Sequence, residues 1–154
     1  FFRAHSKGTF RNSYHRKTGR QKPDLLKIKE VAMQKTHEFV VFEKQPIIEA
    51  VAVIQSNLSR CCVVLNESQK VIGVFSEGDV LRLVLSGTDL HTPVKKVVKP
   101  SFHSLSNHDL AKAFNLVKKF GITLVPVLNE TYELQSVITF HEIMEKVHFS
   151  EEKP

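Results

Sequence analysis

The sequence predicts a mixed α/β (α+β) fold in which two β-α-β-β-α units pack sheet to sheet around a pseudo-twofold axis. Three observations lead to this fold: an internal repeat, apolar runs of strand length, and apolar residues at helical spacing. The chain has 154 residues, of which 42% are hydrophobic. That is enough for two small cores that share an interface.

The internal repeat has a constant offset of 63 residues. Leu65-Asn66-Glu67 recurs as Leu128-Asn129-Glu130, and the same offset pairs Phe39 with Phe102. Apolar positions keep matching apolar positions along the whole window, as expected of a duplicated structural unit. A single short unit cannot bury both faces of its own sheet, so we expect the two copies to pack together. Two related clefts should then lie where the copies meet, a usual place for a ligand.

In the first unit we expect strand, helix, strand, strand and helix. Pro46 opens the first helix, where its missing N–H costs nothing, and Gly87 ends the second. Cys61–Leu65 is uniformly apolar, which is typical of a strand buried on both faces. The expected strands are 39–42, 61–65 and 70–75, and the expected helices are 46–54 and 77–85.

The second unit repeats this order at the same offset. Asp109 begins its first helix and Gly121 ends it. The expected strands are 102–105, 123–128 and 134–138, and the expected helices are 109–120 and 140–147.

We therefore divide the chain into a basic leader or linker (1–26), a first repeat (27–90), a second repeat (91–148) and a tail (149–154). Seven basic and no acidic residues lie between Phe1 and Pro23, within a net charge of +6. We expect this leader to be a linker or tail. Nucleic-acid binding is the alternative for such a segment, although nucleic acid is not the expected partner.

The sequence shows no sign of a membrane span or of an oxidising compartment. No apolar run approaches the ~20 residues that a membrane helix needs, and the first residues have no signal-peptide pattern. Cys61 and Cys62 are neighbours that point to opposite faces of a strand, so we expect free thiols and a cytoplasmic location. The eight histidines lack metal-ligand spacing, so we expect surface or turn roles for them, no metal and no catalytic cofactor.

The strand-to-helix junctions carry the candidate chemistry. Ser76 ends a strand, and Asp79 follows in the first helical turn. The N–H groups at a helix start attract phosphate, and an Asp there can accept hydrogen bonds from a ribose diol. The same spacing, which Thr139 and Glu142 repeat, is also that of a capping box. Spacing alone leaves both interpretations open.

The segment Gly73-Val74-Phe75-Ser76-Glu77-Gly78-Asp79-Val80-Leu81-Arg82 resembles the signature of CBS domains. Val125-Pro126-Val127-Leu128-Asn129 resembles the strand motif of the same family, and residues 28–33 and 94–98 look like the lead-in before each unit. The similarity covers roughly residues 27–147.

This resemblance implies a tandem CBS pair, or Bateman module, that binds AMP, ATP or another adenosyl nucleotide and controls a neighbouring domain or a dimer. It implies no catalysis by the chain itself, although the chain could be part of an enzyme. Asp79 would hold the ribose and Ser76 the phosphate, and the residues before each buried strand would line the base pocket. The residues assigned in this way are Arg60, Cys61, Cys62, Gly73, Ser76, Glu77 and Asp79 in the first unit, and Thr123, Leu124, Val125, Thr139 and Glu142 in the second.

The second unit departs from the family pattern. Ser136 stands in place of the motif Gly, Glu142 in place of the motif Asp, and His141 in place of Gly78. We therefore expect the second site to be altered or empty.

Two further interpretations remain open. Gly78-Asp79-Val80-Leu81-Arg82 and Thr92-Pro93-Val94 are similar to CBS pairs attached to sugar-phosphate isomerases and sugar nucleotidyltransferases. That similarity implies a regulatory tail with an inter-domain linker before it. The alternative is a structural module with vestigial clefts that forms a homodimer through its terminal helices. The apolar residues expected on that dimer face are Val80, Leu83, Val84, Ile143 and Val147.

Overall fold

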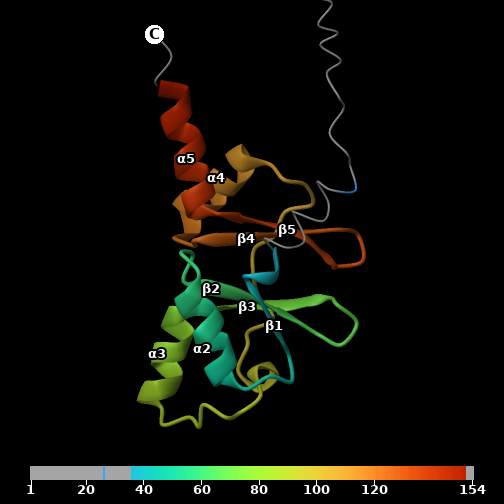
Figure 1. The fold of residues 1–154 in the computed structure, drawn as a ribbon, viewed down its shortest axis with the longest axis vertical. Helices are drawn as coiled ribbons and strands as arrows, with labels where there is room; N and C mark the ends of the chain where they lie inside the picture. Colours follow the sequence, from blue (N-terminus) through green and yellow to red (C-terminus); the bar gives the residue numbers. More distant parts are fainter. Residues whose placement is uncertain (1–25, 27–35, 152–154) are drawn as a thin grey trace, which may run out of the picture.

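The computed structural model of the protein describes residues 26 and 36–151, with the description of 148–151 limited to the backbone. Most of the predicted leader, the first lead-in (28–33) and the end of the tail lie outside the described residues. Two sheets lie face to face in the middle of the molecule, and one pair of helices covers the outer face of each (Figure 1). The predicted arrangement of two units packed sheet to sheet is confirmed.

The first repeat has all five predicted elements. Its strands are β1 (Val40–Phe42), β2 (Cys61–Leu65) and β3 (Val71–Ser76), and its helices are α2 (Ile47–Ser56) and α3 (Glu77–Leu85). The sheet has the order β1-β2-β3, with β1 parallel and β3 antiparallel to β2. The central strand β2 is buried along its whole length, as its apolar sequence predicts.

The second repeat has one strand fewer. It consists of α4 (Leu110–Phe120), β4 (Leu124–Leu128), β5 (Leu134–Thr139) and α5 (Phe140–Glu151). Asp109 caps the start of α4, and Gly121 ends it in the left-handed conformation at φ 66°.

The strand predicted at 102–105 is reduced to a single bridge between Leu105 and Val127. In the first repeat, the N–H of Val63 donates to the carbonyl of Phe39 at 2.6 Å and extends the pairing of β1 with β2. Pro126 occupies the position of Val63 in the second repeat and has no N–H to donate. The equivalent bond to Phe102 therefore cannot form, and the strand is lost.

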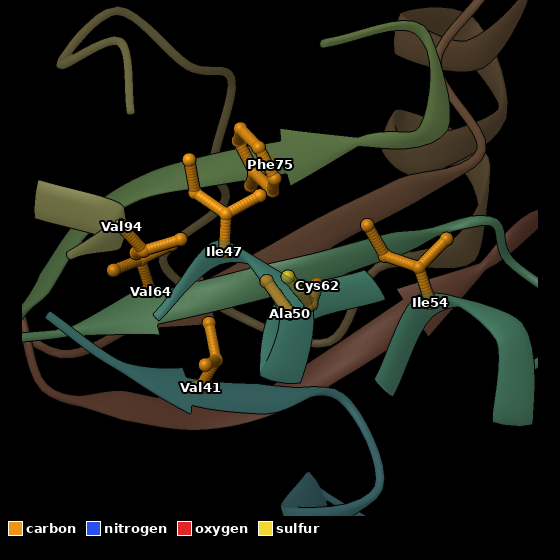
Figure 2. Close-up of a cluster of buried hydrophobic side chains, with 8 residues drawn as sticks. All are labelled: Val41, Ile47, Ala50, Ile54, Cys62, Val64, Phe75 and Val94. Carbon is orange, nitrogen blue, oxygen red and sulfur yellow. The ribbon is translucent and has the colours of Figure 1, made fainter. Parts of the chain in front are cut away.

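The core of the first repeat lies between its sheet and its helices. Figure 2 shows eight side chains that meet there from β1, α2, β2 and β3 and from a short 3₁₀ helix, η1 (Val94–Lys96). Phe75 is the largest of them and is 1% exposed. The full set is Val41, Ile47, Ala50, Ile54, Cys62, Val64, Phe75 and Val94.

A segment at the boundary between the two predicted repeats packs on the first. This strap (residues 90–98) contributes Val94 to the core of the first repeat, with Leu90, Val97 and Val98 packed around it. Its carbonyls at Thr92 and Leu90 accept the N–H groups of Ile47 and Ile48 at 3.0 Å. Since Pro46 has no side chain that can cap α2, the strap satisfies the helix start instead.

The inner faces of the two sheets form a second cluster. Cys61, Val63, Leu65 and Val71 from the first repeat pack there with Leu124 and Leu128 from the second. The N–H of Val71 also donates to the carbonyl of Tyr132 at 2.9 Å. This seam is the contact by which the two repeats form one body.

The third cluster is the core of the second repeat and corrects one expectation. Ile143 is 2% exposed and belongs to this core with Val125 and Ile138, so it cannot be part of a dimer face. Val80 and Leu83 are partly buried against the core of the first repeat. The exposed apolar residues of α3 are Leu81, Val84 and Leu85.

None of the helices within the described residues has the length and apolar content that a membrane span requires.

Candidate functional site

A cleft of about 360 Å³ opens at one edge of the seam and is lined by both repeats. We call it the first cleft, because its polar residues come mainly from the first repeat. Of the predicted site residues, seven lie in its wall. They are Arg60, Cys61, Ser76, Glu77 and Asp79 from the first repeat, and Thr123 and Leu124 from the second.

Seven other wall residues are not among those predicted from the sequence. They come from the same strand-to-helix junction and from two loops of the second repeat. They are Val74, Gly78, Ser101, Phe102, His103, Gly121 and Ile122. The offset of 63 relates Phe102 to Phe39, but no local pattern indicates that the loops of the second repeat turn toward the helix start of the first.

The start of α3 lies in this wall and is held by a capping box. The hydroxyl of Ser76 accepts the N–H of Asp79 at 3.2 Å, and the Asp79 carboxylate accepts the N–H of Ser76 at 2.9 Å. The Ser76 hydroxyl also donates to Asp79 Oδ2 at 2.8 Å. The capping interpretation of Ser76 and Asp79 is therefore confirmed. Because the pair also lines the cleft, capping does not exclude a role in binding.

The second oxygen of Asp79 faces positive charge. Its Oδ1 accepts from Arg82 Nη2 at 2.5 Å and lies 3.9 Å from Lys99 Nζ. Burial alone would raise the pKa of Asp79, but the hydrogen bonds from Ser76 and Arg82 outweigh it and hold the pKa below its usual value. Asp79 is thus a carboxylate at neutral pH, and its 19% exposed side chain keeps one face open to the cleft.

The remaining wall combines apolar surface with a few charges. Val74, Phe102, Ile122 and Leu124 provide the apolar part. Arg60 Nη1 lies 3.8 Å from the Glu77 carboxylate, and both side chains are more than half exposed. The ring of His103 stacks on Phe120 at 3.9 Å between centroids. The cleft thus offers an apolar slot beside a helix start, a carboxylate and exposed cations.

Three predicted residues lie behind the wall of the cleft. Cys62 belongs to the core of the first repeat, Val125 belongs to the core of the second, and both are 0% exposed. Burial raises the pKa of both thiols, Cys61 and Cys62, above the usual cysteine value. Both cysteines are free.

Gly73, the third, is the point where the strap crosses β3. A Cβ atom built on Gly73 would lie 2.5 Å from Val98 Cγ2 and 2.6 Å from the carbonyl oxygen of Lys99. Only glycine permits this approach, which brings Lys99 to Asp79 and leads the chain on to Ser101 and Phe102 in the cleft wall.

The last two predicted residues, Thr139 and Glu142, line another cleft of about 590 Å³. We call it the second cleft. Phe39 and Val137 line it at the positions equivalent to Phe102 and Val74 in the first. Its other lining residues are Thr36, Glu38, His108, Ser136, His141, Glu145 and Lys146.

The helix start in the second cleft differs from that in the first. Thr139 Oγ1 accepts the N–H of Glu142 at 3.1 Å, as in a capping box. The Glu142 carboxylate, however, contacts His108 Nε2 at 3.0 Å, and His108 Nδ1 lies 3.0 Å from the Ser136 hydroxyl. Among the described residues, no group of three or more side chains in either cleft is arranged to hold a metal ion.

Comparison with protein families places residues 28–86 in the CBS domain family. The match spans the first repeat and includes the junction with Ser76 and Asp79.

A curated relative gives a more specific similarity. Over 80 residues the chain is 34% identical to arabinose 5-phosphate isomerase GutQ of Salmonella typhi. The aligned segment covers 51% of this chain and 25% of the isomerase. The chain spans between 25% and 38% of the length of the curated relatives that it matches.

Solved structures of CBS proteins share the fold. A CBS domain protein from Pyrobaculum aerophilum complexed with AMP has 21% sequence identity and a TM-score of 0.59, covering 71% of this chain and 90% of that one. CBSX2 in complex with AMP has 18% identity and a TM-score of 0.62, covering 73% and 88%.

Proposed function

We propose that this chain, a CBS-domain pair by its fold and by the family match of its first repeat, is a regulatory module that binds an adenosine-type nucleotide such as AMP or ATP in the first cleft. The chain itself carries out no catalysis in this proposal. The observation that carries the proposal is the placement of Ser76 and Asp79. Their helix start faces the apolar loops of the other repeat across one cleft.

The chemistry of the wall suits a nucleoside with a phosphate. The apolar slot between Val74 and Ile122 would take the base, because a flat aromatic ring gains most from burial between apolar side chains. Asp79 Oδ1 would accept hydrogen bonds from the ribose diol in place of Arg82. The start of α3 and the guanidinium of Arg82, once released, would then face the phosphate.

The two AMP complexes among the solved structures of the same fold support an adenosine ligand. Regulation would follow from the composition of the wall. A ligand that contacts Asp79 in one repeat and Phe102 in the other stabilises one relative position of the repeats over others. The equilibrium shifts only by the difference in affinity for the two positions.

The proposal is tested by isothermal titration of the chain with AMP, ADP, ATP and S-adenosyl compounds. We expect heat of binding for at least one of them, and we expect Asp79→Ala to weaken that binding by about 1–3 kcal/mol, because the ribose loses a charged acceptor. Asp109→Ala is the matched control. It removes a carboxylate that caps α4 outside the first cleft, and should leave affinity unchanged.

Absence of heat and of any thermal shift at millimolar concentration of every nucleotide would refute the proposal. Equal weakening by Asp79→Ala and Asp109→Ala would assign the effect to helix capping and remove Asp79 from the site.

The exposed apolar face of α3 favours a second candidate function, dimerisation. Leu81, Val84 and Leu85 are 60%, 53% and 88% exposed and lie on one helix. Covering such a face with a second copy removes apolar surface from water. A dimer in analytical ultracentrifugation that does not respond to any nucleotide would favour this function over ligand sensing.

We further propose that the chain is the regulatory part of a longer protein. We keep the division into a leader (1–26), a first repeat (27–90), a second repeat (91–148) and a tail (149–154). The similarity to GutQ over a quarter of that isomerase supports a sugar-phosphate enzyme as the partner domain. The basic leader would then be the linker between them, and the free thiols fit a cytoplasmic location. If the leader instead binds nucleic acid, deletion of residues 1–23 would abolish that binding.

A further inference from the structure

His108 connects two of the three positions at which the second repeat departs from the family pattern. The residue lies just before Asp109, the cap of α4, and its imidazole crosses to the junction of β5 and α5. Nδ1 lies 3.0 Å from the hydroxyl of Ser136, and Nε2 lies 3.0 Å from Oε1 of Glu142. Ser136 replaces the motif glycine and Glu142 the motif aspartate, so one ring holds both substitutions together.

The first repeat has no such bridge. The equivalent positions are Gly73, Asp79 and Gln45. Gly73 has no side chain, and Asp79 is bound to its own helix start. Gln45 points elsewhere: its Oε1 accepts from the Phe42 N–H at 2.7 Å, and its Nε2 donates to Glu49 at 2.5 Å.

The bridge uses the groups that a ribose would need. Glu142 is one methylene longer than aspartate, and its carboxylate extends to His108 instead of closing a capping box. A diol that binds Oε1 of this carboxylate must displace the imidazole, which costs the hydrogen bonds at both ring nitrogens. Because His108 is 43% and Glu142 32% exposed, water replaces part of these bonds, and we expect a penalty of about tenfold in affinity.

We infer that His108 occupies the carboxylate of the second cleft, so that at AMP concentrations that fill the cleft at Asp79 the cleft at Glu142 stays largely empty. His108 is in this sense a specificity-determining residue that acts by occupying the site. The inference rests on the proposed function, since it concerns which of the two clefts takes the nucleotide.

The test is the number of AMP molecules bound per chain at an AMP concentration that just fills the wild-type site at Asp79, measured by equilibrium dialysis or calorimetry. The wild-type chain should bind one, and Asp79→Ala should lose it. His108→Ala should add a second molecule that binds more weakly, and the double variant Asp79→Ala/His108→Ala should keep only that weaker event. Ser136→Gly, which removes the other anchor of the ring, should also add the second molecule.

Glu145→Gln is the control. Glu145 lies in the same cleft and pairs with His141 at 3.1 Å, outside the bridge. Its substitution should leave one AMP per chain, so a gain in this variant would point to charge in the cleft and overturn the role of His108.

Two AMP molecules on the wild-type chain, with one left in Asp79→Ala, would overturn the inference and leave the proposed function intact. A single AMP on both His108→Ala and Ser136→Gly would overturn it as well. Absence of binding in the wild type and in both variants would refute the proposed function, and the inference with it.

Discussion

The two clefts arise from one duplicated unit, yet their helix starts are held in different ways. In the first, the aspartate carboxylate folds back on Ser76 and leaves its second oxygen to Arg82 at the cleft wall. In the second, the glutamate carboxylate extends away from Thr139 to His108. One methylene and one serine hydroxyl distinguish the local cap of the first repeat from the contact of the second with the loop before α4.

The framework around these sites is much better preserved. Gln69 and Tyr132 are equivalent turn residues, and both adopt a positive φ, 61° and 65°. Phe39 and Phe102 line equivalent positions of the second and first clefts. Apart from the strand lost near Leu105, the two repeats keep similar turns and cleft positions and differ mainly at the polar groups of the clefts.

Truncation of a core side chain has the largest expected effect and tests whether the two repeats unfold independently. Phe75 and Ile138 are equivalent and buried, at 1% and 0% exposure. We expect Phe75→Ala to lower the free energy of unfolding by about 3–5 kcal/mol and Ile138→Ala by about 2–5 kcal/mol. Because the seam joins both sheets, each variant should shift one common transition in urea or on heating. Two separate transitions would show that the repeats unfold independently.

A smaller effect is expected at the glycine that distinguishes the first junction. Gly73→Ala places a methyl group against Val98 and the Lys99 carbonyl, and should lower the free energy of unfolding by about 1–3 kcal/mol. In Gly78→Ala the nearest heavy atom to the new methyl is Ser76 Oγ at 3.7 Å, an ordinary contact. That control should raise stability by up to about 1 kcal/mol through helix propensity. Equal free energies of unfolding for Gly73→Ala and Gly78→Ala in urea would mean that the packing of the strap on β3 does not require a glycine at position 73.

The smallest effect is the pH dependence of the first helix start. The pKa of Asp79 is lowered in the folded chain, so its ionised form stabilises the fold above the unfolded-state pKa of about 4. This contribution is lost as the pH falls through the lower folded-state pKa. Asp79→Asn should therefore cost about 1 kcal/mol at pH 7 and progressively less below pH 4, by urea unfolding of both proteins. A difference that stays constant with pH would exclude the carboxylate charge as its cause.

Much of the fold could be predicted from the sequence, because it depends on patterns that are local or repeated. Cys61–Leu65 and Glu77–Leu85 have the predicted bounds, since an apolar run and a capped helix are encoded in adjacent residues. The packing of two sheets followed from the repeat. The lost strand near Leu105 could not be foreseen in this way, because its cause is the missing N–H of Pro126 on the neighbouring strand.

The candidate sites were predictable only where they lie on one segment. Ser76, Glu77 and Asp79 follow from the junction motif. Residues such as Ser101 and His103 reach the first cleft because of the way the two repeats pack, which no local spacing expresses. For His108 the sequence indicates only a surface or turn role, since its contact with Glu142 joins residues 34 positions apart.

The strap limits where the chain can be cut or joined to another protein. Val94 fills the core of the first repeat, and the carbonyls of Leu90 and Thr92 accept the N–H groups at the start of α2, although Thr92 and Val94 belong to the second repeat in the division predicted from the sequence. A chain cut after residue 89 would lose the Val94 side chain from this core and would leave the N–H groups of Ile47 and Ile48 without these acceptors. A piece that contains the first repeat must therefore extend at least to residue 98. Gene fusion, domain grafting and recombinant truncation of the first repeat should each succeed only when the strap is transferred with it.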